Sequence, residues 1–175
     1  MTLNFFFGDE DFLIEKAINK IKQETLGDNI NEFNCKSVDN PNYALFLELL
    51  MSNGTMFGES LVVIKCPKYF LESKQKEKLD DKQTQQLINA LNNLSPRVHF
   101  ILVCPTPRGE KKKPDSRKKL YKEILKLTKP QEFPSYKNYE DYKLIPIIKK
   151  MAAEINLKIN PKEASLLVQV TGASL

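Results

Sequence analysis

The chain opens with Leu3-Asn4-Phe5-Phe6-Phe7-Gly8-Asp9-Glu10-Asp11-Phe12-Leu13-Ile14-Glu15, in which a strand, a glycine turn and the start of a helix follow one another. Residues 3–7 are mostly apolar, as in a short buried strand, and apolar side chains recur at helical spacing from residue 12 to residue 21. A strand, a glycine and a helix N-terminus form the scaffold on which phosphate-binding loops hold ATP. The stretch therefore predicts an α/β fold of the P-loop type.

The residues that would bind phosphate are nevertheless replaced. When the pattern GxxxxGK[ST] is counted from Gly8, Leu13 stands at its second glycine. Ile14 and Glu15 stand at the lysine and at the hydroxyl that binds magnesium. The turn also carries three carboxylates that would repel a triphosphate, at Asp9, Glu10 and Asp11. We therefore predict a nucleotide-binding architecture that binds no nucleotide.

At 175 residues, with 41% hydrophobic and 28% charged side chains, the chain has the composition of an ordinary soluble protein. Its length fits one domain, or one domain with a fragment of a second. No stretch reaches the roughly 20 apolar residues of a membrane span, and the N-terminus lacks the basic start of a secretory signal. These features favour a cytoplasmic protein without a membrane partner.

Cysteine and histidine offer little for catalysis or metal binding. The three cysteines, Cys35, Cys66 and Cys104, are far apart and form no CxxC pattern, so we interpret them as reduced packing residues. His99 is the only histidine, which leaves no His-pair metal site and no Ser-His-Asp triad. We therefore expect no catalytic residue, no metal site and no cofactor.

The net charge of +5 is unevenly distributed along the chain. Residues 1–64 hold four basic against ten acidic side chains, whereas residues 65–129 hold seventeen against seven. A basic middle segment can attract polyanions. We name as a possible DNA-facing patch Arg108, Lys111, Lys112, Lys113, Arg117 and Lys118. Contacts of this kind predict weak, salt-sensitive and sequence-independent DNA binding, with dissociation constants of about 10⁻⁴ to 10⁻⁶ M.

Beyond the opening stretch, predicted strands and helices alternate along most of the chain. Further strands are expected at residues 31–38, 60–65, 98–104 and 132–134, and further helices at residues 41–50, 84–94 and 117–127. The polar residues 72–83 indicate an exposed loop. Such alternation predicts a parallel sheet with helices on both faces. From about residue 140 only helical patterns follow, so we assign domains to residues 1–139 and 140–175.

Four segments carry a resemblance that extends over essentially the whole chain. They are residues 5–15, Met56-Phe57-Gly58, Asp115-Ser116-Arg117-Lys118-Lys119-Leu120, and Leu157-Lys158-Ile159 with the following Leu166-Leu167 and Gly172-Ala173-Ser174-Leu175. In their order and spacing they resemble the delta subunits of the bacterial DNA polymerase III clamp loader. Members of this family have an AAA+-like domain, a small helical lid and a helical collar. The resemblance implies an AAA+-like domain at residues 1–139, followed by a partial lid at residues 140–175.

The resemblance also implies a protein that works without catalysis. Delta subunits lack ATPase motifs; they bind the ring-shaped sliding beta clamp and hold it open for loading onto DNA during replication. Their hydrophobic contact pair is carried over onto Met56 and Phe57, which Gly54 and Gly58 bracket. The implied partners are the clamp and, for the whole protein, the gamma/tau and delta prime subunits. Members of the family are subunits of a DNA-directed DNA polymerase, which is a nucleotidyltransferase.

Four alternatives stay open on the residues alone. One is an ATPase or kinase of the P-loop type, which Leu13, Ile14 and Glu15 disfavour. Another is a stand-alone nucleic-acid-binding module that uses the basic run 111–113, although aromatic side chains for base stacking are missing there. The third concerns Met56 and Phe57, which could fold back under the sheet as core residues. A lysine-rich solvated surface is likewise an alternative to the DNA-facing patch.

Overall fold

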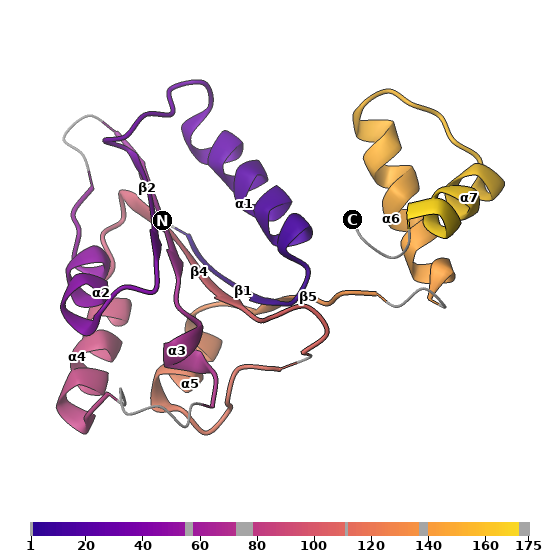
Figure 1. The fold of residues 1–175 in the computed structure, drawn as a ribbon. Helices are drawn as coiled ribbons and strands as arrows, with labels where there is room; N and C mark the ends of the chain where they lie inside the picture. Colours follow the sequence, from indigo (N-terminus) through magenta and orange to yellow (C-terminus); the bar gives the residue numbers. More distant parts are fainter. Residues whose placement is uncertain (1, 55–57, 73–78, 111, 137–139, 172–175) are drawn as a thin grey trace. The chain divides into compact units, whose positions relative to one another are not determined.

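The computed structural model describes residues 2–54, 58–72, 79–110, 112–136 and 140–171 (Figure 1). The chain divides into two compact units, Met1–Phe133 and Pro134–Leu175. The division falls six positions before the boundary at residue 139 that the sequence suggested. We describe each unit by itself.

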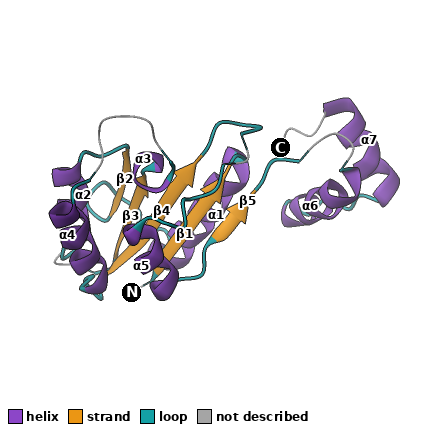
Figure 2. Ribbon diagram, turned by 90° about the horizontal axis from the view of Figure 1, so that it is seen from below, coloured by secondary structure: helices purple, strands orange, loops and turns teal. Residues whose placement is uncertain are grey.

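The first unit is built on a five-stranded sheet in the order β2-β3-β4-β1-β5. Every neighbouring pair of strands is parallel. The strands are β1 (Leu3–Gly8), β2 (Cys35–Asp39), β3 (Ser60–Lys65), β4 (Val98–Pro105) and β5 (Gln131–Phe133). The parallel sheet expected from the alternation of strands and helices is therefore confirmed (Figure 2).

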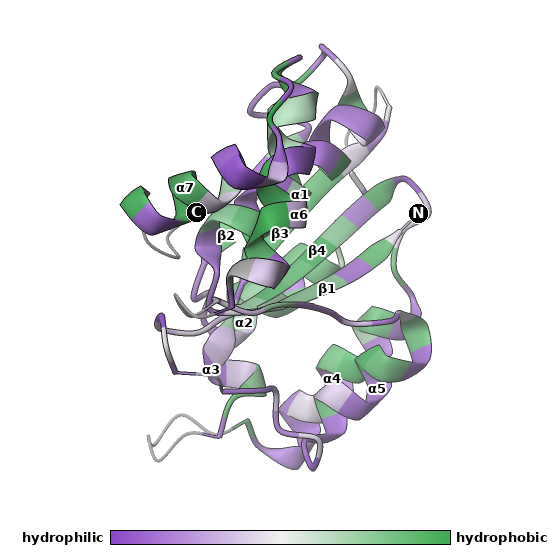
Figure 3. Ribbon diagram, turned by 90° about the vertical axis from the view of Figure 1, so that its right-hand side faces the viewer, coloured by the Kyte–Doolittle hydropathy of each residue, from purple (hydrophilic) through white to green (hydrophobic). Residues whose placement is uncertain are grey.

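Helices cover both faces of the sheet. α1 (Asp11–Leu26) packs on one face, and the other face carries α2 (Tyr43–Leu50), α3 (Pro67–Phe70), α4 (Asp81–Asn92) and α5 (Lys119–Leu127). Figure 1 shows α1 on one side of the strands and these four helices on the other. The central strands β3 and β4 are buried on both faces, and the apolar colouring in Figure 3 follows them. Their mostly apolar sequences are typical of strands that helices cover on both sides.

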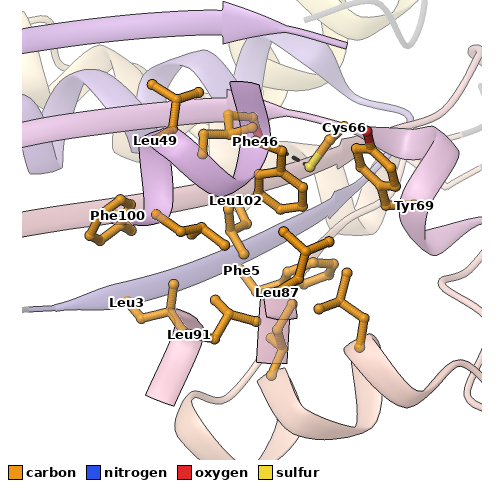
Figure 4. Close-up of a cluster of buried hydrophobic side chains, with 14 of the residues drawn as sticks. Leu3, Phe5, Phe46, Leu49, Cys66, Tyr69, Leu87, Leu91, Phe100 and Leu102 are labelled. Carbon is orange, nitrogen blue, oxygen red and sulfur yellow. Dashed lines mark hydrogen bonds between the residues drawn. The ribbon is translucent and has the colours of Figure 1, made fainter. Parts of the chain in front are cut away.

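Alternate side chains of β1 pack into two separate hydrophobic cores, one on each face of the sheet. Phe5 lies in the larger core and packs edge-on against Phe70, with ring centroids 4.9 Å apart. Phe6 points to the opposite face and contacts the ring of Phe133, 5.2 Å away. Part of the larger core is drawn in Figure 4, where side chains from α2, α3 and the strands meet around Phe5. The three consecutive phenylalanines thus fix β1 between both helical layers.

Of the boundaries that differ from the sequence-based expectation, three have a clear local reason. Residues Cys66-Pro67 do not simply end a strand, because Pro67 begins the short helix α3. Helix α4 begins three residues early, since Asp80 and Gln83 form a capping box at its N-terminus. Strand β2 begins at Cys35 rather than residue 31, because the Asn31 side chain accepts hydrogen bonds from two following backbone amides and forms a turn.

The second unit consists of α6 (Asp141–Glu154) and α7 (Pro161–Thr171). Leu144 and Val168 are buried between the two helices. The Asn160 side chain accepts from the backbone N–H of Glu163, and Glu163 bonds back to the N–H of Asn160, which caps α7. The helical patterns expected after residue 140 thus correspond to α6 and α7. Among the described helices of either unit, none is long and apolar enough to cross a membrane.

Candidate functional site

The turn after β1 is shorter than a phosphate-binding loop. Strand β1 ends at Gly8 and α1 begins at Asp11, so only Asp9 and Glu10 lie between them. In GxxxxGK[ST] four residues separate the two glycines, and their backbone amides surround the phosphates. Here the helix has begun two positions before Leu13, which stands at the second glycine. The turn therefore has less backbone with which to surround a phosphate.

The backbone amides of this turn are bonded to the chain itself. The N–H groups of Asp9 and Glu10 donate to the carbonyl oxygen of Phe133 at 3.1 and 3.2 Å. Gly8 has φ +141°, and a Cβ built on it would lie 2.0 Å from the same oxygen. The glycine is thus needed because the end of β5 passes against it. The carbonyl oxygen of Phe133 thus already accepts hydrogen bonds from the backbone N–H groups that a bound anion would use.

The charges of the site are reversed relative to a nucleotide site. P-loop proteins place a lysine on the loop and an aspartate on a neighbouring strand, where it binds magnesium. Here Glu15 lies on α1 and Lys65 ends β3, and their Oε1 and Nζ atoms are 2.6 Å apart. This hydrogen bond raises the pKa of Lys65. Ile14, at the motif's lysine position, is 2% exposed and packs in the core between α1 and the sheet.

The acidic residues of the turn hold the loop that follows β4. Asp9 is buried, and its Oδ2 atom accepts a hydrogen bond of 2.9 Å from the backbone N–H of Gly109. Glu10 is also buried, with Oε2 at 3.7 Å from the guanidinium of Arg108. Burial raises the pKa of Glu10, while Arg108 opposes that rise. The two carboxylates thus hold the loop that follows β4 against the turn after β1, although the two segments are far apart in the sequence.

The described residues of the proposed DNA-facing patch have partners within the protein. Arg108 faces Glu10, Lys112 pairs with Glu110, Lys113 pairs with Glu132, and Arg117 contacts both Asp115 and Glu72. Hydrogen bonds from Arg117 hold the pKa of Asp115 at about 2. Lys111 lies outside the described residues. These ion pairs place carboxylates beside the lysines and arginines, and the DNA-facing patch stays a prediction.

Lys118 has a structural contact that the sequence did not indicate. Its Nζ donates to the carbonyl oxygens of Lys68, Tyr69 and Leu71 at 3.4, 3.1 and 2.6 Å. These carbonyls belong to the end of α3, where a lysine can satisfy groups that have no partner inside the helix. A pocket of about 340 Å³ opens beside this cap, and both acidic and basic side chains line it. Lys118 therefore joins the start of α5 to the end of α3.

The predicted clamp-binding pair, Met56 and Phe57, lies outside the described residues. Of the two bracketing glycines, Gly54 has φ +78° and Gly58 has φ +133°. A Cβ on Gly54 would lie 3.1 Å from the side chain of Val98 and 3.2 Å from that of Ser60. Both glycines thus have backbone conformations that other residues rarely adopt. Residues 51–59 connect α2 to β3.

Cysteine and histidine side chains serve packing in the described part of the chain. Cys66 and Cys104 are buried free thiols, and burial raises the pKa of Cys104 to about 12. His99 is buried at the start of β4, with Nδ1 at 2.8 Å from the hydroxyl of Thr2. Among the described residues, no group of three or more His, Cys, Asp or Glu side chains could hold a metal ion.

A second hollow was not anticipated from the sequence. It has a volume of about 510 Å³ and lies between α2 and α4, and Met51 and Asn53, which follow α2, also line it. No motif marks it, because its members come from two helices that become neighbours only in the folded chain. The pairing of Lys65 with Glu15 was not anticipated for the same reason, since the two residues lie fifty positions apart in the sequence.

Comparisons with known proteins place the chain in a family. A family model described as "DNA polymerase III, delta subunit" matches residues 5–129. The solved DNA clamp loader delta protein YqeN of Bacillus subtilis is 22% identical, with a TM-score of 0.75. That match covers 96% of this chain and 48% of the Bacillus protein, so this chain spans about half of that protein's length.

A gamma subunit-related protein of Thermotoga maritima is 8% identical, with a TM-score of 0.47, over 95% of this chain and 53% of that one. Curated protein sequences gave no match. The family model covers well over half of the chain, and the chain therefore belongs to the family of DNA polymerase III delta subunits.

Proposed function

We propose that this chain is the clamp-binding part of a clamp-loader delta subunit, which binds and opens the sliding beta clamp without hydrolysing ATP. It acts in the cytoplasm during DNA replication. Its further partners, in the whole protein, are the gamma/tau and delta prime subunits of the loader. Contact with DNA is weak and independent of sequence.

One observation carries the non-catalytic part of this proposal. The carbonyl oxygen of Phe133 accepts hydrogen bonds from Asp9 and Glu10 in the turn where a P-loop would hold phosphate. A bound triphosphate would have to displace this oxygen and also approach two buried carboxylates. Charge reversal at Glu15 and Lys65 adds to the same effect, because a carboxylate replaces the hydroxyl that would bind magnesium. We expect calorimetry to detect no ATP binding at millimolar concentrations, with or without magnesium.

The clamp contact is proposed at Met56 and Phe57. Family membership supports this assignment, as do the positive φ angles of the two glycines on either side of the pair, which other residues rarely adopt. An apolar pair can fill a hydrophobic pocket of a partner and supply most of the binding energy. The alternative is that the pair belongs to the core of the first unit.

The test is the variant Phe57→Ala, measured against the cognate clamp by surface plasmon resonance and in thermal melts. We expect a loss of about 2 kcal/mol or more in clamp binding, with little loss of folding stability. The matched control is Phe33→Ala, which removes a ring that is 81% exposed and lies before β2. A core phenylalanine would instead cost about 3–5 kcal/mol of stability. Unchanged clamp affinity with a collapsed melting temperature would overturn the assignment.

A further inference from the structure

The hollow between α2 and α4 is an open groove with an uncharged lining. The two helices lie side by side on the same face of the sheet (Figure 1). The side chains that line it include Leu47, Met51, Asn53, Gln86, Asn89 and Asn93. None of the described residues that line it is charged, so these side chains offer no cation to a phosphate. A nucleic-acid backbone is therefore a poor match for it.

The floor of the groove is apolar. Leu47 is half-buried against the larger core, and Ala90 is buried on α4. Met51, directly after α2, is 65% exposed although its side chain is apolar. Methionine is flexible and polarisable, which suits it to contacts with another protein's surface. The floor can thus accept an apolar side chain from a partner.

The rim carries amide groups with unused hydrogen-bonding capacity. Gln86 Oε1 accepts from the hydroxyl of Tyr43 at 2.6 Å, and Asn89 Oδ1 accepts from Gln85 at 3.0 Å. The Nδ2 atom of Asn93 donates to the backbone oxygen of Asn89 at 2.8 Å. Among the described residues, no hydrogen bond uses the side-chain NH₂ groups of Gln86 and Asn89 or the side-chain oxygen of Asn93. The rim therefore presents both donors and an acceptor.

Such a lining matches an extended polypeptide backbone. Each residue of a peptide offers one N–H donor and one carbonyl acceptor, and its side chains alternate in direction. Donors on Gln86 and Asn89 fit peptide carbonyl oxygens, and the acceptor on Asn93 fits a peptide N–H. An apolar side chain of the same peptide would contact the exposed side chain of Met51.

The groove adjoins the proposed clamp contact. Asn53 precedes Phe57 by four positions, so the two lie within about 14 Å along even a fully extended chain. A stable interface buries about 800 Å² on each partner, whereas one aromatic side chain supplies only about 150–250 Å². Two anchoring side chains cannot fill such an interface. The surface next to them must supply the rest, and the groove is part of that surface.

We propose that the α2–α4 groove binds an extended main-chain segment of the sliding clamp, beside the pocket that receives Phe57. This inference rests on the proposed function. The segment's carbonyl oxygens accept hydrogen bonds from Gln86 and Asn89, and one of its apolar side chains contacts Met51.

The test uses the double variant Gln86→Glu and Asn89→Asp in the full chain, with the cognate clamp as the binding partner. Both changes keep the oxygen that accepts the existing hydrogen bond and replace the NH₂ donor by a carboxylate oxygen, which repels a peptide carbonyl. We expect clamp affinity to fall by about tenfold or more, with an unchanged melting temperature. The matched control is Gln23→Glu, an exposed amide on α1 across the sheet, which should leave the affinity unchanged.

The outcomes separate this inference from the proposed function. If Phe57→Ala abolishes clamp binding and the double variant leaves it unchanged, the groove assignment is wrong and the clamp assignment stands. If the unaltered chain does not bind the clamp, both are wrong. Hydrogen exchange of the clamp gives an independent measure: the complex should protect backbone amides of one extended segment, and the double variant should remove that protection. Protection confined to the pocket that receives Phe57 would overturn the groove assignment.

Discussion

Gly8→Ala is the substitution that best separates a structural glycine from a phosphate-binding one. The added Cβ would lie 2.0 Å from the carbonyl oxygen of Phe133 and 2.6 Å from its carbon, both of them backbone atoms. Since real Cβ atoms essentially never approach closer than 3.0 Å, the end of β5 must retreat by about an ångström. That movement breaks the hydrogen bonds from Asp9 and Glu10 to the Phe133 oxygen.

The expected cost follows from these contacts. A non-glycine residue held at φ +141° costs about 1–3 kcal/mol. Leaving buried backbone groups without their partner costs about 1–3 kcal/mol more. Together they amount to about 2–6 kcal/mol, against a total stability of about 5–15 kcal/mol for an ordinary domain. At about 2–4 °C for each kcal/mol, the melting temperature should fall by roughly 4–24 °C.

Circular dichroism melts and urea denaturation measure this loss. The control is Gly27→Ala, where φ is +56° and no atom lies within 4 Å of the added Cβ, so only about 1–2 kcal/mol of backbone strain is expected. Equal losses for the two variants would refute the contact with β5. An ATP-induced rise in melting temperature that Gly8→Ala removes would refute the whole interpretation, because it would make Gly8 part of a nucleotide site.

Two further predictions concern side chains whose partners the fold supplies. Lys118→Met should lower the free energy of unfolding by about 1.5–3 kcal/mol in urea denaturation, because the three carbonyls at the end of α3 lose a charged donor. The control Lys112→Met should change the free energy of unfolding by less than about 0.5 kcal/mol. Burial raises the pKa of Cys104 to about 12 from 9.0, so the unfolded chain releases this proton first and stability should fall as the pH rises above 9. Cys104 alone adds a slope of about 1.4 kcal/mol per pH unit, and Cys104→Ala should remove that part of the slope; an identical slope in both proteins would contradict the assignment.

The strands were the most predictable part of the fold. Residues 60–65 and 98–104 were expected as buried strands, and β3 and β4 are found at those places. Their apolar runs are easy to recognise because helices cover both faces of a parallel sheet, so most side chains of its central strands are apolar. The short helix α3 was missed because Pro67 both ends a strand and begins a helix, and four residues are too few for a periodic pattern.

The contacts of charged residues could not be predicted from the sequence. Lys113 and Lys118 read alike in a basic stretch, yet one meets Glu132 on β5 and the other caps α3. Which carboxylate or carbonyl a lysine meets depends on the order of strands in the sheet, and no local pattern encodes that order. The same applies to Phe133, whose carbonyl reaches the turn after β1 only because β5 lies next to β1.

The residues at the phosphate-loop position also determine which substitutions would be needed for nucleotide binding. Ile14, where a P-loop has its lysine, is 2% exposed and packs against the sheet, so a lysine there would be buried in an apolar core. Removing Glu15 would instead leave Lys65 without its partner at 2.6 Å. Neither change would free the turn's amides from the Phe133 oxygen. Each residue that differs from the motif thus makes a different stabilising contact within the fold. We therefore expect that no single substitution would create an ATP-binding site here.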